Sequence, residues 1–445
     1  MSRRVTNGPE PGPLIERFSC LFQNLYCPKT NPSGIVSLGI AENLLCAEEI
    51  LSFSRKAITE NLIQKDLTYG DNLWGSRRLN EALAGFLNRY FNPAVNVDPE
   101  HIITGVGVSA ILDHLFHTLL DAGDGVLILN PYYAGFDRDL VGGRSGVKLV
   151  GVDWAGYKDQ IECQNEDEVQ DEWAGDGGLE EAFEKALQNA RADGVDVRAI
   201  LICNPHNPLG ITVSRSTLIG YCKFAQKHDL HLVSDEIYAM SVYENKSFPG
   251  ARPFCSALSI DLERDIEGHF DKGRLHCVYG MSKDFSANGF RIGALITQHN
   301  PRLLRTLAQL SIQIKISSPA DVIFSTLLTS DYLPTFLRLN QSRLSVAQER
   351  VRTWFERRQV VVRDCNAGHF VWVNLGPRIG IKTRDEETRV FQKLLDGGLY
   401  VAPGSAYHHK TPGWFRVTFS VPPENLEAGL ERLEDLLNLR CADEL

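Results

Sequence analysis

The feature that most constrains the fold is an alternation of short apolar runs and helical patterns between about residues 76 and 320. Runs such as VLIL and HLVS have the length of strands. Leu218, Cys222 and Ala225 recur at the spacing of one helix face. Strands that alternate with helices predict an α/β fold with a large, doubly wound, mixed or parallel sheet. Ligands of such sheets bind at the carboxyl ends of the strands, so we expect functional residues there.

A lysine and an arginine follow one of these runs, in the segment YGMSKDFSANGFRIG. Lys283 comes just after a predicted strand from His276 to Tyr279, and Arg291 lies eight residues further on. Lys283 can form an imine with an aldehyde, as lysines do with pyridoxal phosphate, and Arg291 can bind the phosphate through two parallel hydrogen bonds. The alternative is a solvated lysine and an arginine in a surface ion pair. The other strand ends favour the cofactor.

Two further predicted strands end in residues that suit the same cofactor. Asp235 follows the run HLVS, and a buried carboxylate there would keep the pyridine nitrogen protonated. Tyr238 would donate a hydrogen bond to the phenolic oxygen of the ring. A strand-end aspartate that caps a turn is the alternative for Asp235. After the strand RAILIC, the prolines of NPHNPLG hold Asn207 in a rigid loop, from which it can donate to the same oxygen.

An aromatic pair and a glycine-rich turn complete the pattern. The predicted strand at 126–129 leads to Tyr132 and Tyr133, whose flat rings suit stacking on a heterocycle, although either ring could instead pack in the core. Gly107 precedes a predicted helix that begins near Val108. Free backbone N–H groups at a helix start bind anions, so this turn predicts a phosphate site. Its glycine spacing does not complete a dinucleotide-binding fingerprint.

These motifs together resemble the fold-type I pyridoxal-phosphate enzymes of the class I and II aminotransferase group. The resemblance is strongest to proteins like 1-aminocyclopropane-1-carboxylate (ACC) synthase, including the fungal carbon-sulfur lyases of gliotoxin-type pathways. It covers the chain from about Val36 to Leu437 and rests most on SLGIAENLL, LTYGDNLWGSRRL, NPYYAGFDRDL, CNPHNPLG, SDEIYA, SKDFSANGFRIG and PGWFRVTFS. It implies a large doubly wound domain, a small α+β domain, and a homodimer with the active site at the subunit interface.

The resemblance also implies roles for individual residues. Lys283 would be the Schiff-base lysine, Asp235 the partner of the pyridine nitrogen, and Tyr238 a partner of the phenolic oxygen, and we expect these three to be catalytic. Tyr133 would be the stacking ring. The residues expected to bind the cofactor are Gly107, Val108, Tyr133, Asn207, Asp235, Tyr238, Ser282, Lys283, Arg291 and Tyr69.

Substrate contacts are expected from three residues. Arg416 resembles the arginine that holds the α-carboxylate of the substrate, and we expect Ile40 and Asn207 beside it. Arg416 lies between apolar neighbours in a predicted strand, Trp414 to Phe419, where a buried charge requires a partner. The alternative is an outward-facing arginine paired with a surface acid.

The chain departs from the plant ACC synthases at several positions. Gly280 stands two residues before the Ser-Lys pair, where those enzymes have a serine. Leu73 and Trp74 replace a tyrosine, supplied across the dimer interface, and the histidine that follows it, and Tyr69 is a candidate substitute for the tyrosine. His369 lies beside the substrate region, where an apolar residue is more usual. These changes disfavour strict ACC synthase activity. The segment NLWGSRRLNEALAGFLNRYF and Gly280 resemble the fungal lyases more than the plant enzymes and favour carbon-sulfur elimination.

The substrate decides among three reactions that a base at Lys283 would support. A sulfur leaving group on the β-carbon gives elimination to a thiol, pyruvate and ammonia, whereas a γ-sulfonium allows closure of a cyclopropane. Without either group, reprotonation gives transamination, so a class I/II aminotransferase is the alternative. A non-catalytic regulator of this fold would need an N-terminal DNA-binding domain, and the first 75 residues carry no basic patch or helix-turn-helix pattern.

Composition sets the remaining expectations. The 445 residues are 43% hydrophobic, enough for a sizeable core, and the net charge of -10 disfavours nucleic-acid binding. Ten cysteines without C-x-x-C spacing predict reduced core residues and no metal site. Without an apolar leader or a membrane-spanning segment, we expect a cytoplasmic protein. Acidic residues between 162 and 184 predict a solvated insertion before a helix from Leu179 to Ala192.

We expect four parts along the chain. Residues 1–13 form a flexible tail, and 14–75 an N-terminal arm with a segment of the small domain. Residues 76–320 form the large, pyridoxal-phosphate-binding domain. Residues 321–445 form the C-terminal small domain, with an amphipathic helix and short strands such as HFVWVNL.

Overall fold

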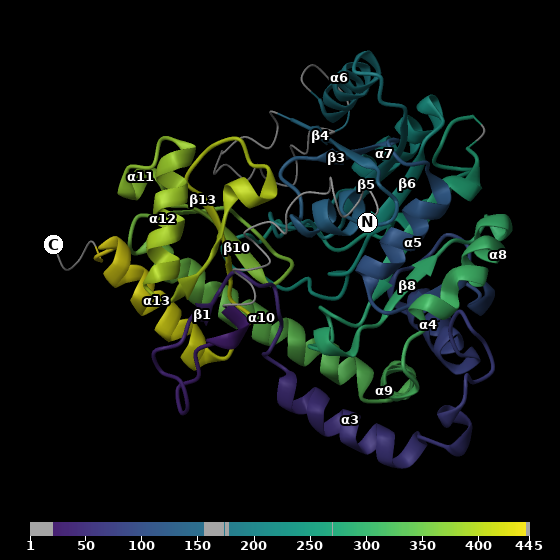
Figure 1. Ribbon diagram of the computed structural model, residues 1–445, viewed down its shortest axis with the longest axis horizontal. Coiled ribbons are helices and arrows are strands. Elements are labelled where there is room, and N and C mark those ends of the chain that lie inside the picture. The colour runs from purple at the N-terminus through teal and green to yellow at the C-terminus, as the bar shows by residue number, and fades with distance from the viewer. Residues whose placement is uncertain (1–20, 155–172, 174–177, 269, 442–445) are drawn as a thin grey trace, which may run out of the picture.

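The computed structural model describes residues 21–154, 173, 178–268 and 270–441 (Figure 1). The expected tail, 1–13, and most of the acidic stretch between 162 and 184 lie outside the described residues. A seven-stranded sheet lies at the centre of one half of the molecule. Its strands, in spatial order, are β2 (Ile102–Gly105), β8 (Gly293–Ile296), β7 (Leu275–Gly280), β6 (His231–Asp235), β5 (Val197–Cys203), β3 (Gly125–Leu129) and β4 (Lys148–Val152).

The sheet is mixed, because β8 runs antiparallel to both of its neighbours while the strands from β7 to β4 are parallel. Side chains alternate between its faces. Val126 and Ile128 of β3 pack in the core on the side of α5 (Val108–Leu119). Leu127 and Leu129 pack toward α6 (Leu179–Ala192) and α7 (Arg215–His228). Helices therefore cover both faces, which confirms the predicted doubly wound α/β fold.

The helices on this sheet begin and end close to where the apolar spacing predicts. They are α5, α6 (Leu179–Ala192), α7 (Arg215–His228) and α8 (Pro301–Leu310). Beside them, α3 (Ala47–Asn61), α4 (Arg77–Tyr90) and α9 (Ser318–Thr329) pack on one another in a further core. Among the described helices, none combines the length and hydropathy needed to cross a membrane.

A second, smaller assembly contains most of the C-terminal residues (Figure 1). Its antiparallel sheet has the order β12 (Ala402–Pro403), β13 (Trp414–Thr418), β10 (Phe370–Asn374) and β9 (Val361–Val362). Close by, β1 (Val36–Ser37) of the N-terminal arm pairs in parallel with β11 (Leu399–Tyr400). The helices here are α11 (Gly376–Ile379), α12 (Arg384–Asp396) and α13 (Pro423–Leu437).

One long helix connects the two assemblies. α10 (Leu333–Glu356) contributes Phe336 to the core around α3 and α4, and Leu344 and Phe355 to the core of the smaller assembly. The arm is tied to both, because β1 joins the smaller assembly and α3 packs against α9. The four-part division of the chain remains our proposal.

Candidate active site

The carboxyl ends of the parallel strands meet at one edge of the large sheet and line a cavity of about 200 Å³. Five of the predicted site residues line it from these strand ends, namely Tyr133, Asn207, Asp235, Tyr238 and Lys283. They lie at or just after the ends of β3, β5, β6 and β7, and the first and last of them, Tyr133 and Lys283, are 150 residues apart in sequence. The parallel register brings them together, as expected of a doubly wound sheet.

Lys283 lies in the turn after β7, and its Nζ donates a hydrogen bond to the carbonyl oxygen of Ala41 at 2.6 Å. Burial, together with the nearby Arg416 guanidinium, lowers the pKa of Lys283 to about 8. A lysine with this pKa is partly neutral near physiological pH. The neutral amine is the form that attacks an aldehyde or takes a proton.

Asp235 is the last residue of β6, and 5% of its surface is exposed. Its Oδ1 accepts a hydrogen bond from the Ile237 backbone N–H at 3.2 Å. Burial raises the pKa of Asp235 to about 7. A buried carboxylate in a cavity is stabilised strongly by a cationic partner, such as a protonated ring nitrogen.

Arg416 lies behind the cavity on β13, with 3% of its surface exposed. Its Nη1 donates to Asn207 Oδ1 at 2.9 Å and its Nη2 to the carbonyl oxygen of Gly39 at 2.5 Å. The guanidinium also lies 4.7 Å from the Phe370 ring centroid and 5.0 Å from that of Tyr407. Within the described residues its Nε is buried without a partner. A buried cation with neutral partners and a spare N–H suits an anionic ligand such as a carboxylate.

A second anion site, suited to a phosphate, lies where α5 begins. Gly107 precedes the helix with a φ of 96°, and a Cβ added there would lie 2.2 Å from Arg291 Nη2. Only a glycine therefore allows this arginine to approach the helix N-terminus so closely. Val108, Ser282 and Arg291 line the same cavity. Backbone N–H groups, a hydroxyl and a guanidinium are together the donors that a phosphate requires.

The sequence analysis missed several residues of this wall, among them Ser109, Arg138 and Asp139. Ser109 and Asp139 both line the cavity, and the Ser109 hydroxyl donates to Asp139 Oδ2 at 2.6 Å. Arg138 pairs with the same carboxylate, Nη2 to Oδ1 at 2.8 Å. The motif NPYYAGFDRDL contains two of these residues, but its charges are also typical of a surface turn. Ser109 could have been predicted, because it lies in the first turn of a helix that begins at an anion site.

The adjacent tyrosines Tyr132 and Tyr133 separate into two roles. Tyr133 lines the cavity, with its ring edge-on to Phe136 at 5.3 Å between centroids. Tyr132 is buried and donates from its hydroxyl to Asp137 Oδ1 at 2.9 Å. Tyr132 therefore packs in the core, which was the alternative to stacking on the cofactor.

Four of the predicted site residues do not line the cavity in this chain, namely Gly107, Arg416, Ile40 and Tyr69. Gly107 and Arg416 adjoin the lining residues Arg291 and Asn207. Ile40 is half-buried between Gly39 and Ala41, whose carbonyl groups hold Arg416 and Lys283. Tyr69 is 75% exposed, in a segment that precedes α4. This exposed segment is defined here as residues 63–74.

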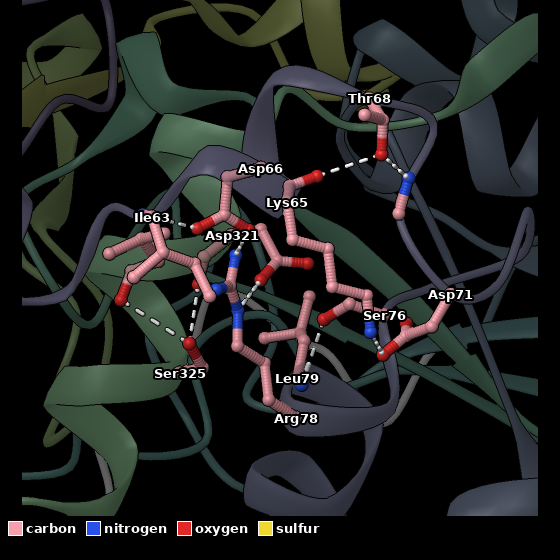
Figure 2. A network of polar contacts seen from close by, with 12 residues as sticks. Ile63, Lys65, Asp66, Thr68, Asp71, Ser76, Arg78, Leu79, Asp321 and Ser325 are labelled. Atoms are coloured by element: carbon pink, nitrogen blue, oxygen red, sulfur yellow. Dashed lines mark hydrogen bonds and ion pairs between the residues drawn. The ribbon is translucent and has the colours of Figure 1, made fainter.

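Ion pairs fix the exposed segment against the body of the molecule (Figure 2). Arg78 of α4 contacts Asp66 at 2.9 Å and Asp321 of α9 at 2.5 Å. Lys65 contacts Asp71 at 3.2 Å, and Asp71 also accepts from a backbone N–H at the start of α4. The segment is thus held in one conformation although its apolar side chains point to solvent.

Comparison with known proteins agrees with this geometry. The model of the family described as aminotransferase class I and II matches residues 33–433. The chain belongs to this family. It is 32% identical over 404 residues to a probable aminotransferase, aclI, of Aspergillus oryzae, covering 90% of both chains. It is 30% identical to ACC synthase 7 of Arabidopsis thaliana, covering 97% of this chain and 93% of that protein.

The fold of this chain is also found in solved aminotransferase structures. An aspartate aminotransferase double mutant from Thermus thermophilus superposes with a TM-score of 0.74 and 22% identity, over 98% of this chain and 99% of that one. The chain is therefore a pyridoxal-phosphate-dependent class I/II enzyme, as predicted. Its residues fit the cofactor, because a phosphate cradle, a lysine amine and a buried carboxylate line one cavity.

Proposed function

We propose that this enzyme is a carbon-sulfur lyase that performs α,β-elimination on a cysteine-conjugate-like amino acid, in secondary metabolism. The observation that carries the proposal is a cavity lined by Lys283, a lysine of lowered pKa, and by Asn207, which accepts from Arg416, a buried arginine with a spare N–H. The segment NLWGSRRLNEALAGFLNRYF and Gly280 support elimination, because they resemble the fungal lyases more than the plant ACC synthases.

Each residue has a defined task in this reaction. Bound pyridoxal phosphate supplies an electron-accepting ring that stabilises negative charge at the substrate Cα. Val108, Ser282 and Arg291 would hold its phosphate, and Tyr133 would stack on its ring. Asp235 would keep the proton on the ring nitrogen, while Tyr238 and Asn207 donate to the phenolic oxygen.

Arg416 would bind the α-carboxylate and so orient the Cα–H bond toward Lys283. The neutral Lys283 amine takes the Cα proton and becomes an ammonium. The Cβ–S bond then breaks with its electron pair on sulfur, and a proton gives the free thiol. The remaining three-carbon product hydrolyses to pyruvate and ammonia.

The alternatives are a class I/II aminotransferase or an ACC synthase acting on S-adenosylmethionine. Product analysis of the purified enzyme with S-benzyl-L-cysteine, S-adenosylmethionine and common amino acids with a 2-oxo acid distinguishes them. A lyase releases phenylmethanethiol, pyruvate and ammonia in equal amounts. A new 2-oxo acid without free thiol would indicate an aminotransferase, and a cyclopropane product an ACC synthase.

The exposed segment supports a homodimer with the active site at the subunit interface. Its most exposed apolar side chains are Ile63, Leu67 and Tyr69, exposed by 58%, 79% and 75%. A cluster of exposed apolar groups on a segment fixed by ion pairs is typical of an interface. We propose that Tyr69 of one copy reaches the cofactor site of the other.

A further inference from the structure

A chain of buried hydrogen bonds lies directly behind Lys283. Asp284, the next residue, accepts from the Tyr279 hydroxyl at 2.8 Å, the Met240 backbone N–H at 2.9 Å and the Ser241 hydroxyl at 2.5 Å. The Ser241 oxygen also lies 2.9 Å from Nε2 of His369. Asp284, Ser241, Tyr279 and His369 are all fully buried. The chain therefore joins the turns after β6 and β7 to the start of β10.

This series of hydrogen bonds fixes the tautomer of the His369 imidazole. Three donors to Asp284 stabilise its carboxylate form, although burial raises the pKa of Asp284 to about 7. Ser241 gives its one hydroxyl proton to Asp284, so it can only accept from His369. Nε2 of His369 then carries the hydrogen and Nδ1 carries a lone pair. Burial holds the pKa of His369 far below its usual value, so the ring is neutral.

Nδ1 of His369 is an acceptor without a donor in the described part of the chain. Lys283 has the complementary excess, because an ammonium has three donors and the hydrogen bond found for it is to Ala41. The two groups are neighbours by geometry, because the Tyr238 ring packs edge-on against the imidazole, 5.2 Å between centroids, and lines the cavity together with Lys283. The Lys283 charge accordingly adds to burial in lowering the pKa of His369.

We propose that His369 is a positioning residue for Lys283, whose free ammonium, in the apoenzyme as in turnover, exchanges between the Ala41 carbonyl oxygen and Nδ1 of His369. The charged and titratable groups that face this imidazole are Lys283, Arg416 and Tyr238, with Asp284 acting through Ser241. The contact stabilises the ammonium that forms when Lys283 takes the substrate proton, and the proton stays on Nζ. The inference rests on the proposed role of Lys283.

The rate at which pyridoxal phosphate attaches to the apoenzyme tests the inference without a substrate. Only the neutral amine attacks the aldehyde, so the pH dependence of this rate reports the pKa of Lys283. In His369→Phe the ammonium loses an acceptor, and we expect the midpoint to fall by about 0.5 to 1 unit. At pH 7 attachment should then be roughly three- to fivefold faster than in the wild type. A merely structural lesion would slow it.

Two variants control for the loss of a buried imidazole. In His369→Gln, Nε2 can still donate to Ser241 while the amide oxygen accepts, so the midpoint should match the wild type. His276 is also buried, at the other end of β7, with hydrogen bonds to His231 at 3.1 Å and Thr297 at 3.0 Å. His276→Phe should therefore leave the midpoint unchanged.

The outcomes separate the inference from the function on which it rests. An unchanged or raised midpoint in His369→Phe would overturn the inference alone. An equal shift in His276→Phe would also overturn it. Attachment that persists in Lys283→Ala would remove the assigned lysine, and the inference with it. If His369→Phe does not fold, His369→Leu makes the same test with a residue type that is usual at this place in the family.

Discussion

The cavity wall and the exposed segment are both fixed in position, but by different means. Asp235 and Lys283 are carried by neighbouring parallel strands, so sheet register sets their separation. Residues 63–74 are instead held by side-chain ion pairs through Arg78, and Tyr69 projects into solvent. The residues that line the wall come from one chain, whereas the described part of that chain leaves Ile63, Leu67 and Tyr69 of the segment largely uncovered. The difference indicates that chemistry belongs to the wall and assembly to the segment.

The largest effect is expected at the wall. Lys283→Ala should abolish the covalent link to pyridoxal phosphate and lower kcat by about 10⁴-fold, because both nucleophile and base are lost. Borohydride reduction followed by peptide mapping checks the link in the wild type. A pyridoxyl group on another lysine would contradict the assignment of Lys283. The cavity wall would then no longer be identified as the catalytic region.

Asp235→Asn should be the next most severe change. The fold and some cofactor binding should remain, but kcat should fall by about 10²- to 10³-fold, because the ring nitrogen loses the carboxylate that keeps it protonated. Steady-state kinetics at matched cofactor occupancy measures the loss. Activity within a few-fold of the wild type would mean that the buried carboxylate is structural.

Arg416→Lys tests whether the smaller assembly takes part in the wall. A point charge cannot reproduce two parallel hydrogen bonds, so kcat/KM for amino acids should fall by about 10²-fold while the cofactor absorbance stays unchanged. Stopped-flow titration of that absorbance with substrate gives the dissociation constants. Equal constants in both proteins would move the carboxylate site elsewhere.

Mixing a Tyr69→Ala copy with a Lys283→Ala copy tests the exposed segment directly. Tyr69→Ala should lower activity by about tenfold if the tyrosine acts across a dimer. Dimers of a Tyr69→Ala chain and a Lys283→Ala chain contain one intact site, so an equimolar mixture should recover about a quarter of wild-type activity. Recovery would fail if each chain used its own Tyr69.

The smallest effect is expected from Arg78→Ala. The change leaves Asp66 and the buried Asp321 without their cation and should cost about 1–3 kcal/mol of stability, seen as a Tm lower by a few degrees. Arg77→Ala, at the exposed neighbour, is the matched control and should change Tm little. If Arg78→Ala lowered kcat as severely as Asp235→Asn, the division between the two regions would be wrong.

Much of the wall could be predicted from the sequence because strand ends are marked locally. Asp235 and Lys283 each follow an apolar run, and parallel strands bring such positions to one edge. The burial of Arg416 followed from its apolar neighbours, but its contacts with Asn207 and Gly39 did not, because they join segments 209 and 377 residues apart.

Other features of the site could not be predicted either, because they depend on contacts between segments that are distant in sequence. Asp139 reaches Ser109 only through the irregular turn at Asp137–Val141, which no periodicity predicts. The position of Tyr69 in the sequence does not distinguish a residue of its own site from one that serves another copy. The family and cofactor are confirmed, and the individual roles at the site stay predictions.

The N-terminal arm has a consequence for binding thermodynamics. Two carbonyl groups that are two residues apart, those of Gly39 and Ala41, hold Arg416 and Lys283. A carboxylate that draws Arg416 away from Gly39 disturbs the backbone that also anchors the lysine. Linkage is reciprocal, so if release of Lys283 from Ala41 is favoured by a carboxylate at Arg416, the released state binds carboxylates more tightly by the same factor. The backbone of the arm would then couple the two side chains through the single residue between Gly39 and Ala41.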